Sequence, residues 1–140
     1  MNTPATMPAD ASPIASSSTE AVLRSQLLKT AQQLDTLGLN RGTSGNVSAR
    51  VSSSYWLVTP SGVPVDKLSA KAMVLMDFEG KPASNGKPSS EWRFHHDILV
   101  GRSDVGAVVH THSRFATAFS CLQKDIPAFH YMIAAAGGDS

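Results

Sequence analysis

One segment of the chain carries glutamate and histidine side chains of the kind used in metal-assisted proton transfer. Glu91 follows two serines, Ser89 and Ser90, and a later apolar run ends in His110 and His112. On an extended strand, side chains two residues apart point to the same face, so both imidazoles are expected to reach one metal ion. A carboxylate beside such an ion can act as a general base. Two ordinary strand histidines would give the same spacing, and spacing alone leaves that alternative open.

Segments rich in glycine and hydroxyl residues are candidate phosphate sites. Gly45 and Asn46 end the stretch GTSGN, Ser61 and Gly62 lie in TPSG, and the two serines stand directly before Glu91. Glycine lets backbone amides approach a ligand closely, and hydroxyl and amide side chains add further donors. The same residue types also form ordinary turns, so each segment by itself is weak evidence for phosphate binding.

Hydrophobic periodicity predicts the elements that would position these groups. Apolar residues at helical spacing follow a possible capping pair, Ser17 and Glu20, and stop at Gly38, which predicts one amphipathic helix. Alternating and β-branched runs predict strands, with a hairpin across residues 52–54. Strands are expected at residues 47–51, 55–59, 73–77 and 106–112, and further helices at 66–72, from Ser89 or Ser90 to Gly101, and after Ser113.

This pattern of elements favours a mixed α/β domain with a largely antiparallel sheet, because hairpins join antiparallel strands. Glu91 is expected in the first turn of its helix, a position that acidic residues also favour because of the helix dipole alone. His95 and His96 lie on the same expected helix. We expect them to be polar surface or hydrogen-bonded core residues rather than metal ligands.

Composition restricts the class of protein. The 140 residues fit one domain, with residues 1–16 as a flexible Ala-, Pro-, Ser- and Thr-rich extension and residues 17–140 as the folded part. The 12 basic and 11 acidic residues nearly cancel, which argues against nucleic acid or an anionic membrane as partner. Cys121 is the only cysteine, so we expect no internal disulfide, no CxxC metal site and a reducing cytoplasm. No apolar run approaches the roughly 18 residues of a membrane span, so a soluble protein that binds small molecules is expected.

Five segments occur in an order and wording typical of one protein family. The chain contains, in order, GTSGNVSAR, TPSGVPVDKL, KPSSEWRFH, AVVHTHS and IPAFHYMIAAAGG. Together they resemble the class II aldolase and adducin head family over residues 20–140. The resemblance implies a three-layer α/β fold, in which a mixed, mostly antiparallel sheet lies between helices. It also implies a homo-oligomer, usually a tetramer, with active sites between subunits.

The resemblance further implies roles for individual residues. His110 and His112 match ligands of Zn²⁺, for which another divalent metal is possible, and Glu91 matches the acid/base that forms the enediolate of dihydroxyacetone phosphate. Tyr131 matches a tyrosine that reaches a neighbouring subunit's site and handles the proton on the aldehyde oxygen. The residues implied to hold the substrate phosphate are Gly45, Asn46, Ser61, Gly62, Ser89 and Ser90.

The implied activity is that of a zinc-dependent aldehyde-lyase. It would reversibly cleave a phosphorylated ketose similar to L-fuculose 1-phosphate into dihydroxyacetone phosphate and an aldehyde. The family's third zinc histidine lies in a C-terminal section that these residues do not match, so we expect a domain truncated at its C-terminus. Related family reactions remain alternatives, namely 4-epimerisation, dehydration or decarboxylation of sugar phosphates. A non-catalytic binding domain like the adducin head is a further alternative.

Overall fold

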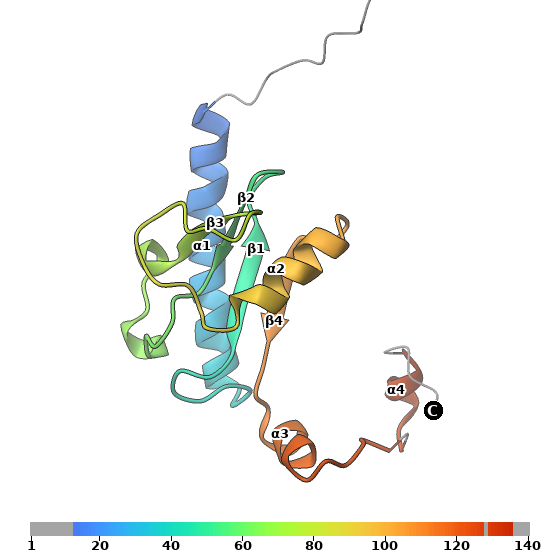
Figure 1. Cartoon of the computed structure of the whole chain (residues 1–140). Coiled ribbons are helices and arrows are strands. Elements are labelled where there is room, and N and C mark those ends of the chain that lie inside the picture. Colours follow the sequence, from blue (N-terminus) through green and yellow to red (C-terminus); the bar gives the residue numbers. More distant parts are fainter. Residues whose placement is uncertain (1–12, 128, 136–140) are drawn as a thin grey trace, which may run out of the picture.

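A four-stranded antiparallel sheet forms the centre of the computed structural model, which describes residues 13–127 and 129–135 (Figure 1). The strand order is β3-β2-β1-β4, and all three pairings are antiparallel. The hairpin expected across residues 52–54 is confirmed, because it joins β1 to β2. The strands are β1 (Asn46–Arg50), β2 (Tyr55–Val58), β3 (Val74–Asp77) and β4 (Ala107–His110).

Helices cover both faces of the sheet, which confirms the expected three layers (Figure 1). Alternate side chains of a strand point to opposite faces, so β2 supplies Leu57 to one apolar cluster and Trp56 and Val58 to another. The cluster on the side of α1 (Pro13–Thr36) is Leu27, Leu34, Val47, Ala49, Leu57 and Met73. The cluster on the side of α2 (Trp92–Gly101) is Trp56, Val58, Val74, Met76 and Leu99.

Helix α1 ends where the sequence predicts but begins earlier. Gly38 has a φ of +70°, and the amides of Leu39 and Asn40 donate to the carbonyl oxygen of Leu34, which stops the helix. Its first residue is Pro13 rather than Ser17, and proline suits a first helical turn because the amide hydrogen that it lacks has no partner there. Residues 13–16 of the expected extension are therefore helical, and residues 1–12 lie outside the described residues.

Two further expectations need correction near the sheet. The helix expected at 66–72 is two separate 3₁₀ turns, Val65–Lys67 and Ala70–Ala72. Helix α2 begins at Trp92, so Glu91 is its N-cap residue rather than part of its first turn, and neither serine caps it. The end of α2 at Gly101 is as expected.

The chain leaves the sheet after β4. This strand ends at His110, so His112 lies beyond it in non-repetitive backbone rather than within the expected strand 106–112. Ser113 precedes α3 (Arg114–Cys121) as expected, and α4 (Tyr131–Ala135) follows at a distance from the sheet (Figure 1). The apolar side chains of Phe115 and Leu122 remain exposed. Within the described part of the chain, no helix is both long and apolar enough to cross a membrane.

Candidate active site

The strand pairing brings the candidate residues to one end of the sheet. Asn46, the first residue of β1, lies directly opposite His110, the last residue of β4. Because β1 and β2 are antiparallel, the end of β2 reaches the same place. There the amide of Ser89 donates to the carbonyl oxygen of Thr59 at 3.0 Å, which ties the start of α2 to the end of β2. Residues far apart in the sequence therefore meet at this end.

A pocket of about 230 Å³ lies at this end of the sheet. Its walls are mainly hydroxyl, amide and glycine residues, so it offers donors rather than an apolar surface. The pocket is smaller than the roughly 300–1,000 Å³ typical of sites for drug-sized ligands, which suits a small polar molecule. The residues expected to hold phosphate, Gly45, Asn46, Ser61, Gly62, Ser89 and Ser90, all line it together with Glu91 and His112.

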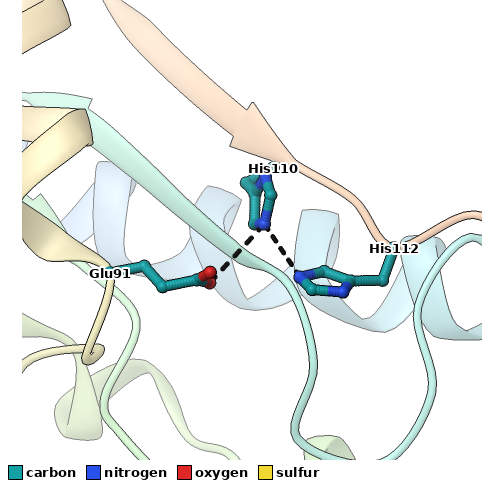
Figure 2. A group of neighbouring side chains, drawn as sticks. All are labelled: Glu91, His110 and His112. Carbon is teal, nitrogen blue, oxygen red and sulfur yellow. Dashed lines mark hydrogen bonds and ion pairs between the residues drawn. The ribbon is translucent and has the colours of Figure 1, made fainter. Parts of the chain in front are cut away.

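Glu91, His110 and His112 point toward one another beside the pocket (Figure 2). The Nε2 atoms of the two histidines are 2.8 Å apart, and Nε2 of His110 is 3.5 Å from Oε2 of Glu91. One donor atom from each side chain lies within 4.8 Å of the others. From the sequence, Glu91 was interpreted only as a base. In the structure its carboxylate also lies close enough to both histidines to be a third metal ligand.

The donor set fits a metal of the zinc type. Two imidazoles and a carboxylate are zinc ligands, and three protein ligands are usual in catalytic zinc sites. Two ligand atoms on one tetrahedral zinc ion are about 3.3 Å apart, given bond lengths of about 2.0–2.1 Å. The observed separations of 2.8 and 3.5 Å lie on either side of that value. Since His112 is exposed, small rotations of its side chain can adjust the remaining distance.

The carboxylate of Glu91 is held by neighbours from β1 and from its own loop. Nδ2 of Asn46 donates to Oε2 of Glu91 at 2.7 Å and to Oγ of Ser89 at 2.9 Å. Oγ of Ser89 also accepts from the amide of Glu91 at 3.3 Å. Asn46 and Ser89 are buried, so these bonds meet little competition from water. The protein thus fixes the carboxylate without help from a bound ligand.

His95 is a buried partner in this arrangement that sequence reasoning did not assign to the site. It has no solvent exposure, and its ring nitrogens contact Oγ of Ser48 at 2.7 Å and Oδ1 of Asn46. Burial, and to a smaller extent the nearby His110, lowers the pKa of His95 from 6.5 to about 4 against the opposing effect of Glu91. One signal was available in the sequence, because residues four apart, such as Glu91 and His95, share a helix face.

Asn40 is a second residue that the sequence analysis missed. It is buried, and its Oδ1 accepts from the backbone amide of His112 at 2.9 Å. Gly45 has a φ of +71°, and a Cβ there would collide with the side chain of Asn40. Glycine suits position 45 for two reasons, the left-handed backbone conformation and the close contact with the side chain of Asn40. Through Asn40, the glycine loop and the histidine segment are packed as one unit.

Tyr131 is not part of this pocket in the described chain. It is the first residue of α4, and its side chain is 77% exposed. Its ring packs against that of His130, with centroids 4.5 Å apart. In the structure Tyr131 thus contacts His130 and does not line the pocket that contains Glu91.

Comparison with known proteins identifies the family. A family model described as the class II aldolase and adducin N-terminal domain matches residues 25–140. The chain therefore belongs to this family, and the resemblance drawn from its five segments is confirmed.

Similar proteins carry aldolase names. A 5-methylthioribulose-1-phosphate/5-deoxyribulose-1-phosphate aldolase from Rhodospirillum rubrum is 55% identical over 117 residues, covering 84% of this chain and 52% of that protein. An L-fuculose phosphate aldolase from Escherichia coli is 48% identical over 118 residues, covering 84% and 54%. The chain thus spans about half the length of the curated relatives it matches.

A solved structure supports the fold independently. An L-fuculose 1-phosphate aldolase matches with a TM-score of 0.73 and 34% sequence identity, covering 79% of this chain and 53% of that one. The helix–sheet–helix arrangement is therefore that of a class II aldolase.

Proposed function

We propose that the protein is a divalent-metal-dependent aldolase, with zinc as the metal, that reversibly cleaves a ketose 1-phosphate into dihydroxyacetone phosphate and an aldehyde. The observation that carries this proposal is the pocket in which three hydroxyl- and glycine-rich segments meet Glu91 and His112. Such a pocket joins phosphate donors, a carboxylate and the imidazole of His112 within one small cavity, and His110 lies next to Glu91 and His112. Membership of the class II aldolase family supports the same chemistry.

The substrate phosphate would bind among the donors of the pocket. Gly45 and Gly62 both have positive φ, which turns the backbone sharply and opens their amides to a ligand. The hydroxyls of Ser61 and Ser90 line the same cavity and can donate to phosphate oxygens. We assign Asn46 and Ser89 to the boundary of this subsite, since their side chains also hold Glu91.

Glu91 would transfer the proton at carbon. A zinc ion held by His110 and His112 would supply Lewis-acid polarisation of the substrate carbonyl. In the direction of synthesis, the carboxylate of Glu91 removes a proton from the carbon next to that carbonyl, and in cleavage it returns the proton to the same carbon. The 2.7 Å hydrogen bond from Asn46 keeps one carboxylate oxygen oriented, while the other oxygen remains available for the proton.

We assign Tyr131 to the aldehyde oxygen of a neighbouring subunit's site. Its exposed position on α4, away from the pocket of its own chain, agrees with a role across an interface in a homotetramer. In that role the phenol hydroxyl would donate its proton to the aldehyde oxygen during synthesis and accept it during cleavage.

Substrate identity can be tested directly. The names of the relatives suggest 5-methylthioribulose 1-phosphate, 5-deoxyribulose 1-phosphate and L-fuculose 1-phosphate as candidates. We would incubate zinc-loaded protein with each compound and follow dihydroxyacetone phosphate and aldehyde by mass spectrometry. Cleavage of at least one compound is expected. An epimer, a dehydrated product or carbon dioxide in place of these products would assign one of the related reactions, and unchanged substrates would favour a binding domain.

A further inference from the structure

A buried chain of hydrogen bonds leads from the sheet to the carboxylate of Glu91. Oγ of Ser48 on β1 contacts Nδ1 of His95 at 2.7 Å, and Nε2 of His95 contacts Oδ1 of Asn46. Nδ2 of Asn46 then reaches Oε2 of Glu91 at 2.7 Å. Ser48 and His95 have no solvent exposure and Asn46 is 6% exposed, so water cannot readily replace a missing partner.

The chemistry of the four side chains determines which atom donates and which accepts in each of these hydrogen bonds. An ionised carboxylate only accepts hydrogen bonds, so the amide NH₂ of Asn46 must face Glu91. The amide oxygen of Asn46 then faces the ring of His95, which must donate from Nε2. In a neutral ring, Nδ1 is consequently the acceptor for the hydroxyl of Ser48. Moving the ring proton to Nδ1 would set a lone pair against the amide oxygen and favour rotation of the amide away from Glu91.

We propose that His95 is a positioning residue, which orients the amide of Asn46 and through it the carboxylate of Glu91. The importance of this position for catalysis rests on the proposed function, in which Glu91 is the acid/base. The hydrogen-bond chain itself exists independently of any activity. Its burial beneath the pocket makes it a fixed support rather than a group that touches substrate.

The ring proton of His95 provides a first test that needs neither metal nor substrate. Nitrogen-15 NMR of the metal-free protein is expected to show a neutral ring protonated at Nε2, with slow exchange of the side-chain amide protons of Asn46. A ring protonated at Nδ1 would overturn the proposal. If the ring is protonated at Nε2 but the protein cleaves no ketose phosphate, the hydrogen-bond chain is upheld and the proposed function is rejected. Failure of this inference and failure of the proposed function can therefore be told apart.

Substitutions provide the second test. His95→Leu removes the donor to Asn46, whereas His95→Gln places an amide NH₂ near the former Nε2 position. We expect His95→Leu to lower zinc affinity, measured by competition with a metal indicator, and kcat by about 10- to 100-fold, the usual effect of losing a supporting hydrogen bond. We expect His95→Gln to recover most of both losses.

The matched control is the neighbouring histidine on the same helix. Nε2 of His96 contacts the carbonyl oxygen of Phe78 at 3.0 Å, and the residue takes no part in the chain to Glu91. His96→Leu is expected to leave zinc affinity and kcat unchanged. Equal losses in His95→Leu and His95→Gln would show that the ring only fills space and would overturn the proposal. If His95→Leu does not fold, the tautomer measurement still decides.

Discussion

Glu91 and His112 face the same pocket but are held by different surroundings. The carboxylate of Glu91 accepts from Asn46, which is itself buried and bonded to Ser89 and His95. The side chain of His112 is exposed, and its backbone amide donates a hydrogen bond to Oδ1 of Asn40. The carboxylate of Glu91 is therefore preorganised by the fold, whereas the imidazole of His112 is left for a metal ion to order.

This difference suits the proposed chemistry. A general base acts best when its position is fixed before the substrate arrives, because orientation then costs nothing at the reaction step. Metal ligands can be more mobile, since bonds to the ion supply their final geometry. Three predictions test this contrast, in order of decreasing effect.

Substitution of Glu91 is expected to have the largest effect. Glu91→Gln keeps the shape of the side chain but cannot take up a proton, so the rate of carbon–carbon cleavage should fall by about two to four orders of magnitude. His110 and His112 should still bind zinc, but more weakly than with the Glu91 carboxylate as third donor, so the rate is measured at a zinc concentration at which elemental analysis shows the variant to be loaded. Glu79→Gln is the control, because Glu79 is exposed, pairs with Lys81 and does not line the pocket. An undiminished rate in Glu91→Gln would reject its assignment.

Lowering the pH should destabilise the folded protein through His95, which supports Asn46 and Glu91. Above pH 6.5 this ring is neutral in the folded and unfolded states, so it adds no pH dependence. Between pH 6.5 and about 4, the unfolded chain binds a proton that the folded chain excludes, because burial lowers the folded pKa. The free energy of unfolding should thus fall with falling pH, by about 3 kcal/mol in total.

Urea unfolding of metal-free protein across this pH range measures the effect, with His95→Gln as comparison. The substituted protein keeps every other titrating group, so its stability should depend less steeply on pH. Identical pH profiles for the two proteins would show that His95 is not buried as a neutral ring.

A substitution of Gly45 should disturb Asn40 and, through it, the backbone of His112. Gly45→Ala forces a Cβ into the side chain of Asn40 at a φ of +71°, whereas Gly42→Ala meets no atom within 4 Å at a φ of +65°. We expect Gly45→Ala to be less stable than Gly42→Ala by about 2 kcal/mol, the cost of overpacking. Thermal unfolding gives the difference, and NMR should show a shift of the His112 amide in Gly45→Ala alone. Equal stability of the two variants would mean that the side chain of Asn40 moves aside without a cost in stability.

Local patterns in the sequence predicted much of the fold. Alternation and helical spacing gave the four strands, the end of α1 at Gly38 and the end of α2 at Gly101, because these features depend on neighbours in the chain. The start of α1 and the split of the 66–72 segment were missed. Propensity is weak at such boundaries, and tertiary contacts decide them.

The candidate site was predictable in its parts but not in its connections. Glu91, His110 and His112 were found from residue type and spacing. The spacing of Glu91 and His95 indicated only a shared helix face. The link between His95 and Asn46, and the contact of Asn40 with His112, depend on how β1 pairs and packs, and no local pattern contains that information.

Other assignments remain predictions, because they depend on contacts outside this chain. The assignment of Tyr131 to a neighbouring subunit is one of them, since its position on α4 does not bring it to the pocket of its own chain. The tetrameric assembly is another.

Zinc content of the purified protein, beside a His110→Ala, His112→Ala double variant, tests the central claim most directly. The claim is that Glu91, His110 and His112 together hold one divalent metal ion beside the phosphate pocket. Elemental analysis is expected to find about one zinc ion per chain in the wild-type protein and none in the folded double variant. Folded wild-type protein that takes up no zinc, or a double variant that retains it, would contradict the account.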